Sequence, residues 1–190
     1  MELIKVLPGK GKHLRNALLV YRNKDGKIKE YTVTGRRKIR HRSDLEGFVA
    51  GVIVVVTSPS GAVLVTKEFR LGVNHELFGF PSGMCDHHET VEKCAVREVY
   101  EETGIENVVI DEVSSPMYIN PAMGNEKIVI IYGHIENVQS PGGSNHVNEE
   151  ISSFWLPPAD IPGFLNEHKE DISVVNRLIL EQLSIRRRTS

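Results

Sequence analysis

The sequence has few of the residues that mark secreted, membrane-spanning or nucleic-acid-binding proteins. Two cysteines in 190 residues are too few for a disulfide framework, and they indicate a reduced, cytoplasmic protein. The most apolar run, residues 48–56, is far shorter than a membrane span, and the N-terminus has no run long enough for a signal peptide. The net charge of −2 gives no global argument for nucleic-acid binding. We therefore expect neither a membrane nor a nucleic acid as a partner.

The first 42 residues have the pattern of a β-rich arm. Short strands are expected at residues 17–21 and 28–33, around a turn that ends in Asp25-Gly26. A basic run follows at residues 36–42 and includes Arg37. This run is either a solvated linker or a positive edge near a phosphate site.

The rest of the chain alternates between strand patterns and helix patterns. Apolar residues make up 40% of the sequence, which is enough for a sizeable core. The patterns predict strands at 48–57, 62–69, 108–119, 126–135 and 154–156, an irregular segment at 71–81, and helices near 87–103, 159–167 and 172–185. This order favours an α/β (α+β) fold in which helices cover both faces of a mixed sheet.

The first of these helices has carboxylates beside its apolar stripe. Asp86 and Glu89 resemble a capping box, and Gly104 resembles a C-cap. At about 100° per residue, Glu98 and Glu102 fall inside or beside the stripe formed by residues 91, 95 and 99. Two carboxylates one turn apart repel each other, and partial burial strengthens the repulsion. Either Arg97, whose position faces Glu101, or a divalent cation must offset this charge.

The spacing of these residues matches a known motif at every constrained position. The motif is Gly-x5-Glu-x7-Arg-Glu-U-x-Glu-Glu-x-Gly-U, where U is a bulky apolar residue, and it runs from Gly83 to Ile105. The sequence therefore resembles a Nudix hydrolase. The resemblance implies a Nudix α/β/α sandwich with a mixed sheet at residues 46–190, preceded by an antiparallel β arm at residues 1–45.

The resemblance also implies a metal-dependent hydrolase of a nucleoside diphosphate linked to another group. Mg²⁺ or Mn²⁺ would neutralise the pyrophosphate and activate a water. The implied metal ligands are Glu98 and Glu102, with Glu101 binding or supporting a metal and the Ser82 carbonyl adding an oxygen. Arg97 and Glu89 would pair and orient the ligands.

Features outside the box resemble the ADP-ribose pyrophosphatase group. The resemblance makes Arg70, Pro121, Met123 and Glu126 the candidate substrate-binding residues, together with Arg37 of the basic run. It implies cleavage of ADP-ribose to AMP and ribose 5-phosphate, in a homodimer that exchanges its N-terminal arms. The alternatives are a UDP- or GDP-sugar pyrophosphatase, a non-catalytic nucleotide-sensing module and an enzyme that removes damaged nucleoside triphosphates.

The general base is expected on the loop before the late strand. Glu149 is the candidate for the base or a further metal ligand, and Glu150 is the next candidate. The alternative is that both are exposed loop glutamates. His87 and His88 are expected to be exposed loop residues rather than zinc ligands, because no cysteine or histidine quartet surrounds them. Cys94 is expected to pack in the core, and Cys85 to lie in a loop.

Overall fold

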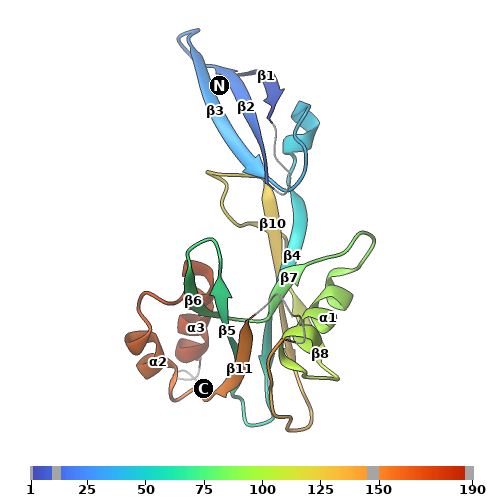
Figure 1. Cartoon of the computed structure of the whole chain (residues 1–190), viewed down its shortest axis with the longest axis vertical. Coiled ribbons are helices and arrows are strands. Elements are labelled where there is room, and N and C mark those ends of the chain that lie inside the picture. The colour runs from blue at the N-terminus through green and yellow to red at the C-terminus, as the bar shows by residue number, and fades with distance from the viewer. Residues whose placement is uncertain (1, 10–13, 145–149, 187–190) are drawn as a thin grey trace. The chain divides into compact units, whose positions relative to one another are not determined.

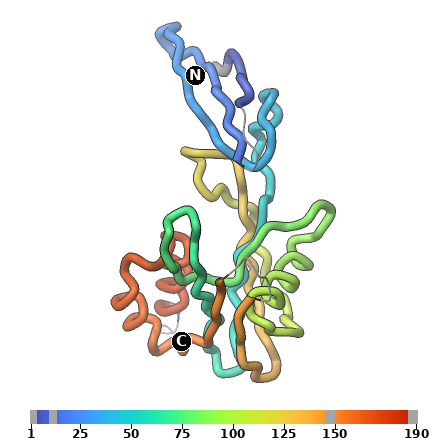
Figure 2. Tube along the Cα trace, in the orientation of Figure 1, coloured from blue at the N-terminus to red at the C-terminus, as the bar shows by residue number. Residues whose placement is uncertain are grey.

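The computed structural model describes residues 2–9, 14–144 and 150–186, which form two compact units. The first unit takes Met1–Ala50 and Pro116–Ile128, and the second takes Gly51–Ser115 and Val129–Ser190. The chain therefore enters the first unit twice, in blue to cyan and again in yellow (Figure 2). The expected boundary between residues 45 and 46 stays a prediction.

The first unit is built on a three-stranded antiparallel sheet. Its strands are β1 (Glu2–Pro8), β2 (Arg15–Arg22) and β3 (Ile28–Gly35), in the order β1-β2-β3. The turn between β2 and β3 is the predicted one, because the Asn23 side chain accepts the Asp25 and Lys27 amides and Gly26 has a φ of 79°. The sequence patterns located β2 and β3 and missed β1. Residues Ala17, Leu19, Val33 and Ile39 form a small buried core.

The segment 116–128 packs against β3 within the first unit. It contains β9 (Met117–Tyr118) and the start of β10 (Glu126–His134). The Thr34 amide donates to the Met123 carbonyl at 2.7 Å, and the Tyr31 hydroxyl donates to the Ala122 carbonyl. A Cβ on Gly124 would lie 2.3 Å from the Thr34 carbonyl oxygen, so this approach requires glycine. A short 3-10 helix, η1 (Arg42–Leu45), completes the unit.

Most of an eight-stranded sheet lies in the second unit and forms its scaffold, while β9 and the ends of β4 and β10 belong to the first unit. Its central order is β11-β5-β4-β10-β8, while β6 pairs with β5, β7 with β4 and β9 with β10. The strands not yet given are β4 (Phe48–Thr57), β5 (Val63–Arg70), β6 (His75–Gly79), β7 (Ser82–Met84), β8 (Val109–Val113) and β11 (Ile151–Leu156). Buried valines from β4 and β5 make the centre of this sheet apolar.

Helices cover both faces of this sheet in the second unit. Helix α1 (Val91–Thr103) lies on one side of the strands, and α2 (Ile161–Glu167) and α3 (Val174–Arg186) lie on the other (Figure 1). The α2–α3 side encloses a core that includes Val63, Val65, Leu165 and Leu180. The predicted mixed α+β class, with helices on both faces, is confirmed.

The start of α1 differs from the prediction. The expected capping residue was Asp86, but the N-cap is Thr90, whose side chain accepts the Lys93 amide at 3.3 Å. Half of the expected capping box is present, in the turn before the helix: the Asp86 amide donates to the Glu89 carboxylate, whereas the Glu89 amide donates to the Asp86 backbone carbonyl instead of the Asp86 side chain. The predicted C-cap is confirmed, since Gly104 has a φ of 71°.

Three other segments differ from the sequence patterns. The strand expected at residues 108–119 is interrupted, because only β8 and β9 pair with β10 and residues 114–116 lie between them. The segment expected to be irregular contains β6, which pairs with β5 along its whole length. Each of the last two helices begins two residues later than expected. For the two strand segments, the pairing partner decides the element, and local patterns contain no information on that partner.

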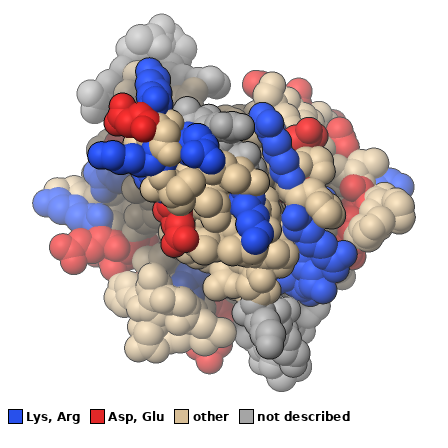
Figure 3. All heavy atoms as spheres, turned by 90° about the horizontal axis from the view of Figure 1, so that it is seen from above, with Lys and Arg blue, Asp and Glu red and all other residues tan. Residues whose placement is uncertain are grey.

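The charges on the surface are mixed, and the helices are short. Figure 3 shows lysine and arginine side chains separated by acidic and uncharged ones over the face that it presents. Among the described residues, each helix is too short or too polar to cross a membrane.

The expectation of reduced cysteines was wrong. Cys85 and Cys94 are joined by a disulfide, with their Cα atoms 5.2 Å apart. Cys94 is fully buried on α1, as expected for a packing residue, and Cys85 lies in the preceding loop. Two cysteines nine residues apart do not reveal whether a turn and a helix bring them together, so their number alone predicted free thiols.

This disulfide should be detectable in the purified chain. Denatured protein that has not been reduced should react with no maleimide, and reduction should expose two reactive thiols. Closing a loop of this length should stabilise the fold by about 2–3 kcal/mol, mainly through the unfolded state. Urea unfolding with and without a reductant measures this difference. Two maleimide-reactive thiols in the unreduced chain would contradict the pairing.

Candidate active site

The buried face of α1 includes two carboxylates. Glu98 is 9% exposed and Glu102 is 5% exposed, on the same face as the buried Ala95 and Val99. The helical positions predicted this placement, and it is confirmed. Buried carboxylates without a compensating group are costly, so their surroundings determine what this face can bind.

Arg97 connects the loop before α1 to the helix. Its Nε and Nη2 donate to the two oxygens of Glu89 at 2.9 and 2.8 Å, a bidentate pair. Its Nη1 donates to Glu98 at 2.7 Å and to Glu101 at 2.9 Å. Its Nη2 also donates to the Met84 carbonyl at 3.0 Å. One guanidinium therefore orients three carboxylates and the backbone carbonyl of Met84.

The pairing with Arg97 keeps Glu89 ionised. The hydrogen bonds from Arg97, followed by that from the Asp86 amide, lower the pKa of Glu89 to about 2. The hydrogen bond to Glu89, followed by those to Glu98 and Glu101, raises the pKa of Arg97 above its ordinary value. The predicted pair of Arg97 and Glu89 is present, although Glu89 lies before the helix rather than on it.

The hydrogen bonds to Glu102 are longer than those between Arg97 and Glu89. The Ser82 amide lies 3.3 and 3.4 Å from its two oxygens, which is a long contact. The pKa of Glu102 is raised to about 9, mainly by burial. The Ser82 amide and the charge of Arg70 oppose this increase, and the charges of Glu68 and Glu98 add to it. Without a cation, this carboxyl is protonated at neutral pH.

The strand β7 lies directly against the Glu98 carboxylate. A Cβ added to Gly83 would lie 2.1–2.2 Å from the carboxylate atoms of Glu98, so a side chain there would displace the carboxylate. The first glycine of the motif is therefore needed to leave room for the Glu98 carboxylate.

Two charged residues lie at the end of β5. The Arg70 guanidinium binds the Glu68 carboxylate at 2.8 Å, and both charges act on Glu102. Arg70 was predicted as a substrate contact. Glu68 was not assigned a role, although it lies two positions earlier on the same strand, a spacing that puts both side chains on one face.

Of the two candidate bases, only Glu150 lies among the described residues. Glu149 lies outside the described residues. Glu150 is exposed, and its carbonyl accepts the Phe69 amide at 3.2 Å, next to the end of β5. The base therefore stays a prediction.

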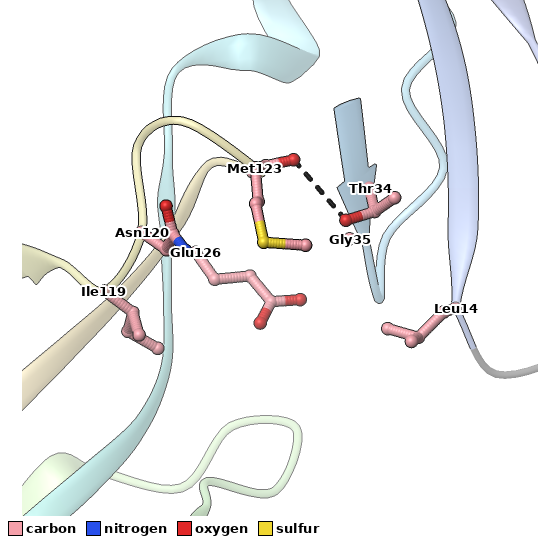
Figure 4. A pocket seen from close by; sticks show the side chains of 8 residues that line it. Leu14, Thr34, Gly35, Ile119, Asn120, Met123 and Glu126 are labelled. Carbon is pink, nitrogen blue, oxygen red and sulfur yellow. Dashed lines mark hydrogen bonds between the residues drawn. The ribbon is translucent and has the colours of Figure 1, made fainter. Parts of the chain in front are cut away.

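The other predicted substrate residues belong to the first unit. The side chains of Met123 and Glu126 point into a hollow that Leu14, Thr34 and Ile119 help to line (Figure 4). Glu126 accepts the Arg36 amide at 2.7 Å.

Arg37 and Pro121 also lie in the first unit. The Arg37 guanidinium lies 3.9 Å from the centre of the Phe48 ring, as a cation–π pair. Pro121 lines a second hollow with three tyrosines, Tyr21, Tyr31 and Tyr118. The roles of these residues stay predictions.

The histidines of the loop before α1 are exposed, as predicted. His87 and His88 contact each other, with ring centres 4.0 Å apart. Cys85, Glu89 and Cys94 bring possible ligand atoms within 4.8 Å of one another. However, the two sulfurs are bonded to each other in the disulfide, and the Glu89 carboxylate binds Arg97. These atoms are therefore already engaged and do not form a metal site.

Comparison with known proteins identifies the family to which the chain belongs. The model of the NUDIX domain matches residues 47–178, and the chain belongs to this family. Nudix enzymes are hydrolases that generally use divalent metals.

Three curated relatives are similar over part of the chain. An uncharacterized Nudix hydrolase of Schizosaccharomyces pombe is 30% identical over 116 residues, 61% of this chain and 55% of that protein. An ADP-ribose pyrophosphatase of Saccharomyces cerevisiae is 25% identical over 143 residues, 72% of this chain and 60% of that protein. A putative 8-oxo-dGTP diphosphatase of Bacillus subtilis is 26% identical over 118 residues, 62% of this chain and 72% of that protein. The chain thus spans less than two thirds of the first two.

A solved structure has the same fold over nearly the whole chain. It is the crystal structure of an ADP compounds hydrolase, with a TM-score of 0.63 and 16% identity, and it covers 96% of this chain and 95% of its own. At this identity the match shows the fold alone.

The raised pKa of Glu102 predicts how pH affects the metal-free chain. The unfolded carboxyl releases its proton near pH 4.5 and the folded one near pH 9. Between these values the folded chain holds the extra proton, so the free energy of unfolding should fall as pH rises. In Glu102→Gln this decline should be smaller. Urea unfolding in EDTA at about pH 5 and about pH 8.5 measures the difference.

Glu92→Gln is the matched control for this measurement. Glu92 lies on the exposed side of the first turn of the same helix. This variant should keep the pH dependence of the wild type. Equal slopes for Glu102→Gln and the wild type would contradict the assignment.

Proposed function

We propose that the chain is a divalent-metal-dependent pyrophosphohydrolase that cleaves ADP-ribose, or a related nucleoside diphosphate sugar, at its pyrophosphate bond. With ADP-ribose the products are AMP and ribose 5-phosphate. The observation that carries this proposal is the pair of buried carboxylates, Glu98 and Glu102, on the motif helix of a NUDIX domain. Two buried acids one turn apart are costly in any protein that does not bind a cation there.

The donor atoms suit Mg²⁺ or Mn²⁺. Glu98, Glu101 and Glu102 offer carboxylate oxygens, the Ser82 carbonyl can add another, and hard cations prefer such ligands. Glu102 fits this role because its only hydrogen bond among the described residues is the long one from Ser82. A cation bound there would neutralise the pyrophosphate and lower the pKa of the attacking water.

The protein's own residues would hold the reactants in place. Arg97 fixes Glu98 and Glu101 through one guanidinium, which limits the positions that their oxygens can take. Arg70 would bind a substrate phosphate, since a guanidinium matches phosphate oxygens in pairs. Glu149, or Glu150 in its place, would accept the proton of the water as it attacks phosphorus. Attack on either phosphorus breaks its bond to the bridging oxygen, which leaves with the other phosphate, so that AMP and ribose 5-phosphate are the products.

The substrate class rests on the relatives and on the first unit. A relative named ADP-ribose pyrophosphatase is similar over 72% of the chain, which supports an ADP-linked substrate. The first unit offers a hollow with Met123 and Glu126, and a carboxylate there could accept hydroxyl groups of a terminal sugar. Pro121 and the cationic Arg37 are further candidates for substrate contacts.

Three other functions compete with this one. A UDP- or GDP-sugar could fit the same pyrophosphate chemistry. Damaged nucleoside triphosphates are favoured by the similarity to a putative 8-oxo-dGTP diphosphatase. A non-catalytic sensing module is disfavoured, because every carboxylate of the motif is present.

A homodimer through the N-terminal arm belongs to the proposal. Leu7, Leu18 and Ile28 lie on the face of the three-stranded sheet opposite its small core, and Leu7 and Ile28 are 39% and 55% exposed. A second copy would cover such a face. The disulfide removes the argument from free cysteines for a cytoplasmic location, which stays a prediction.

A product assay tests the function. Full-length protein with Mg²⁺ should hydrolyse ADP-ribose faster than UDP-glucose, GDP-mannose or nucleoside triphosphates, with AMP as the nucleotide product. Glu102→Gln should lower kcat by about 100-fold or more, because it removes charge that stabilises the transition state. Turnover of none of these substrates by the folded wild type would overturn the proposal.

A pair of variants tests the base. Glu149→Gln should lower kcat by about 100-fold with little change in KM, because proton transfer to a positioned base contributes this much. Glu150→Gln serves as the comparison and should act weakly if Glu149 is the base. Nearly normal kcat values in both variants would show that neither residue is the base.

A further inference from the structure

The Cys85–Cys94 disulfide closes a covalent ring that contains Glu89. Glu89 is the bidentate partner of Arg97, which lies one turn after Cys94 on α1. His88, in the same ring, has a φ of 72°, a conformation that costs free energy for a residue with a side chain. The disulfide and Arg97 therefore hold the ring against α1 together.

The two terminal nitrogens of Arg97 face different groups. Nη1 donates to two carboxylates of α1. Nη2 donates to Glu89 at 2.8 Å and to the Met84 carbonyl at 3.0 Å, and it lies 3.7 Å from the sulfur of Cys94. A change at the disulfide therefore reaches Nη2 first, and the rigid, planar guanidinium transmits it to the carboxylates that Nη1 binds.

The two sulfurs of the disulfide differ in access and in surroundings. Cys94 is fully buried, whereas Cys85 is partly exposed in its loop. A small thiolate therefore reaches Cys85 more readily, and attack there makes Cys94 the leaving group. The guanidinium of Arg97 lies beside this leaving sulfur, in the first turn of α1, where the helix dipole is also positive. Both charges stabilise a thiolate, and a stable leaving thiolate speeds exchange.

The exchange consists of two displacements. A thiolate RS⁻, such as that of glutathione, attacks the Cys85 sulfur, and the electron pair of the broken bond leaves with Cys94. A second RS⁻ attacks the sulfur of R in the mixed disulfide, so that Cys85 leaves as a thiolate and RSSR forms. Protons that the two attacking thiols release to water return to the protein sulfurs. The chain is reduced by two electrons, two thiols are oxidised to RSSR, and the reverse steps restore the bond.

We propose that the Cys85–Cys94 disulfide is a reversible thiol-exchange site, with a small thiol as co-reactant and Cys85 as the residue attacked, and that opening it weakens the cation site. The open ring loses its covalent link to α1, and His88 can leave its costly conformation. The Cys94 thiolate then competes with Glu89 for Nη2 of Arg97, so that Arg97 holds the carboxylates of α1 in less defined positions. This second step rests on the proposed function, because it concerns the same cation.

Glutathione tests the exchange in the folded chain. The oxidised protein is incubated with millimolar glutathione without urea, quenched with acid and treated with maleimide, and peptide mass spectrometry locates both labels. Glutathione should be found on Cys85 and maleimide on Cys94 at early times, followed by two free thiols. A disulfide that opens only in urea would be purely structural and would overturn the proposal. Glutathione on Cys94 would overturn the order of attack.

Mn²⁺ binding tests the second step without an activity readout. The oxidised and the reduced chain, freed of reductant under argon, are titrated while electron paramagnetic resonance measures free Mn²⁺. The reduced chain should bind Mn²⁺ about 10-fold more weakly, the lower end of the range found when groups that orient metal ligands are lost. Circular dichroism checks that it is folded. Equal affinities, or a reduced chain that is unfolded at the temperature of the titration, would overturn this step.

Cys85→Ser is the matched variant. Cys85 is partly exposed, so a hydroxyl is tolerated there, and the variant cannot form the bond. It should bind Mn²⁺ as weakly as the reduced wild type, and its affinity should not respond to reductant. Affinity equal to that of the oxidised wild type would contradict the second step. If the oxidised wild type itself does not bind Mn²⁺, the proposed function fails together with this step, whereas the glutathione reaction still decides the exchange at Cys85.

Discussion

The contacts of one guanidinium organise the functional face of this protein. Arg97 binds Glu89 before the helix, Glu98 and Glu101 on it, and the Met84 carbonyl at the end of β7. Loss of the Arg97 side chain would remove a partner from several partly buried carboxylates, which is more costly than the loss of a surface ion pair. The turn before α1, the helix and the strand beside it therefore depend on a single side chain for their relative positions.

The opposite end of the same face is organised by a shortage of positive charge. Arg97 satisfies its acids with short hydrogen bonds, whereas Glu102 has a buried carboxyl and a long contact from Ser82. The proposed cation would stabilise the second end. Binding free energy would then come from the relief of the charge of Glu102.

The helical period predicted the buried acids because Glu98 and Glu102 occupy the positions of apolar residues in the stripe. The motif likewise predicted the pair of Arg97 and Glu89, and the valine-rich pattern predicted β4. The disulfide, β6 and the break before β9 depend on which segments meet in space, and local patterns do not contain that information. Glu68 was missed for a related reason: its charge acts on Glu102 of α1, a helix that begins more than twenty residues later.

The first unit is assembled from distant parts of the chain, and this affects how it can form. Tyr31 donates to the Ala122 carbonyl, and the Thr34 amide donates to the Met123 carbonyl, across separations of about ninety residues. During synthesis the N-terminal strands leave the ribosome first, but their partner segment follows only after α1 and β8 have been made. The bonds of β3 to residues 122 and 123 can therefore form only after these residues have emerged, and until then the same groups of β3 bond to water.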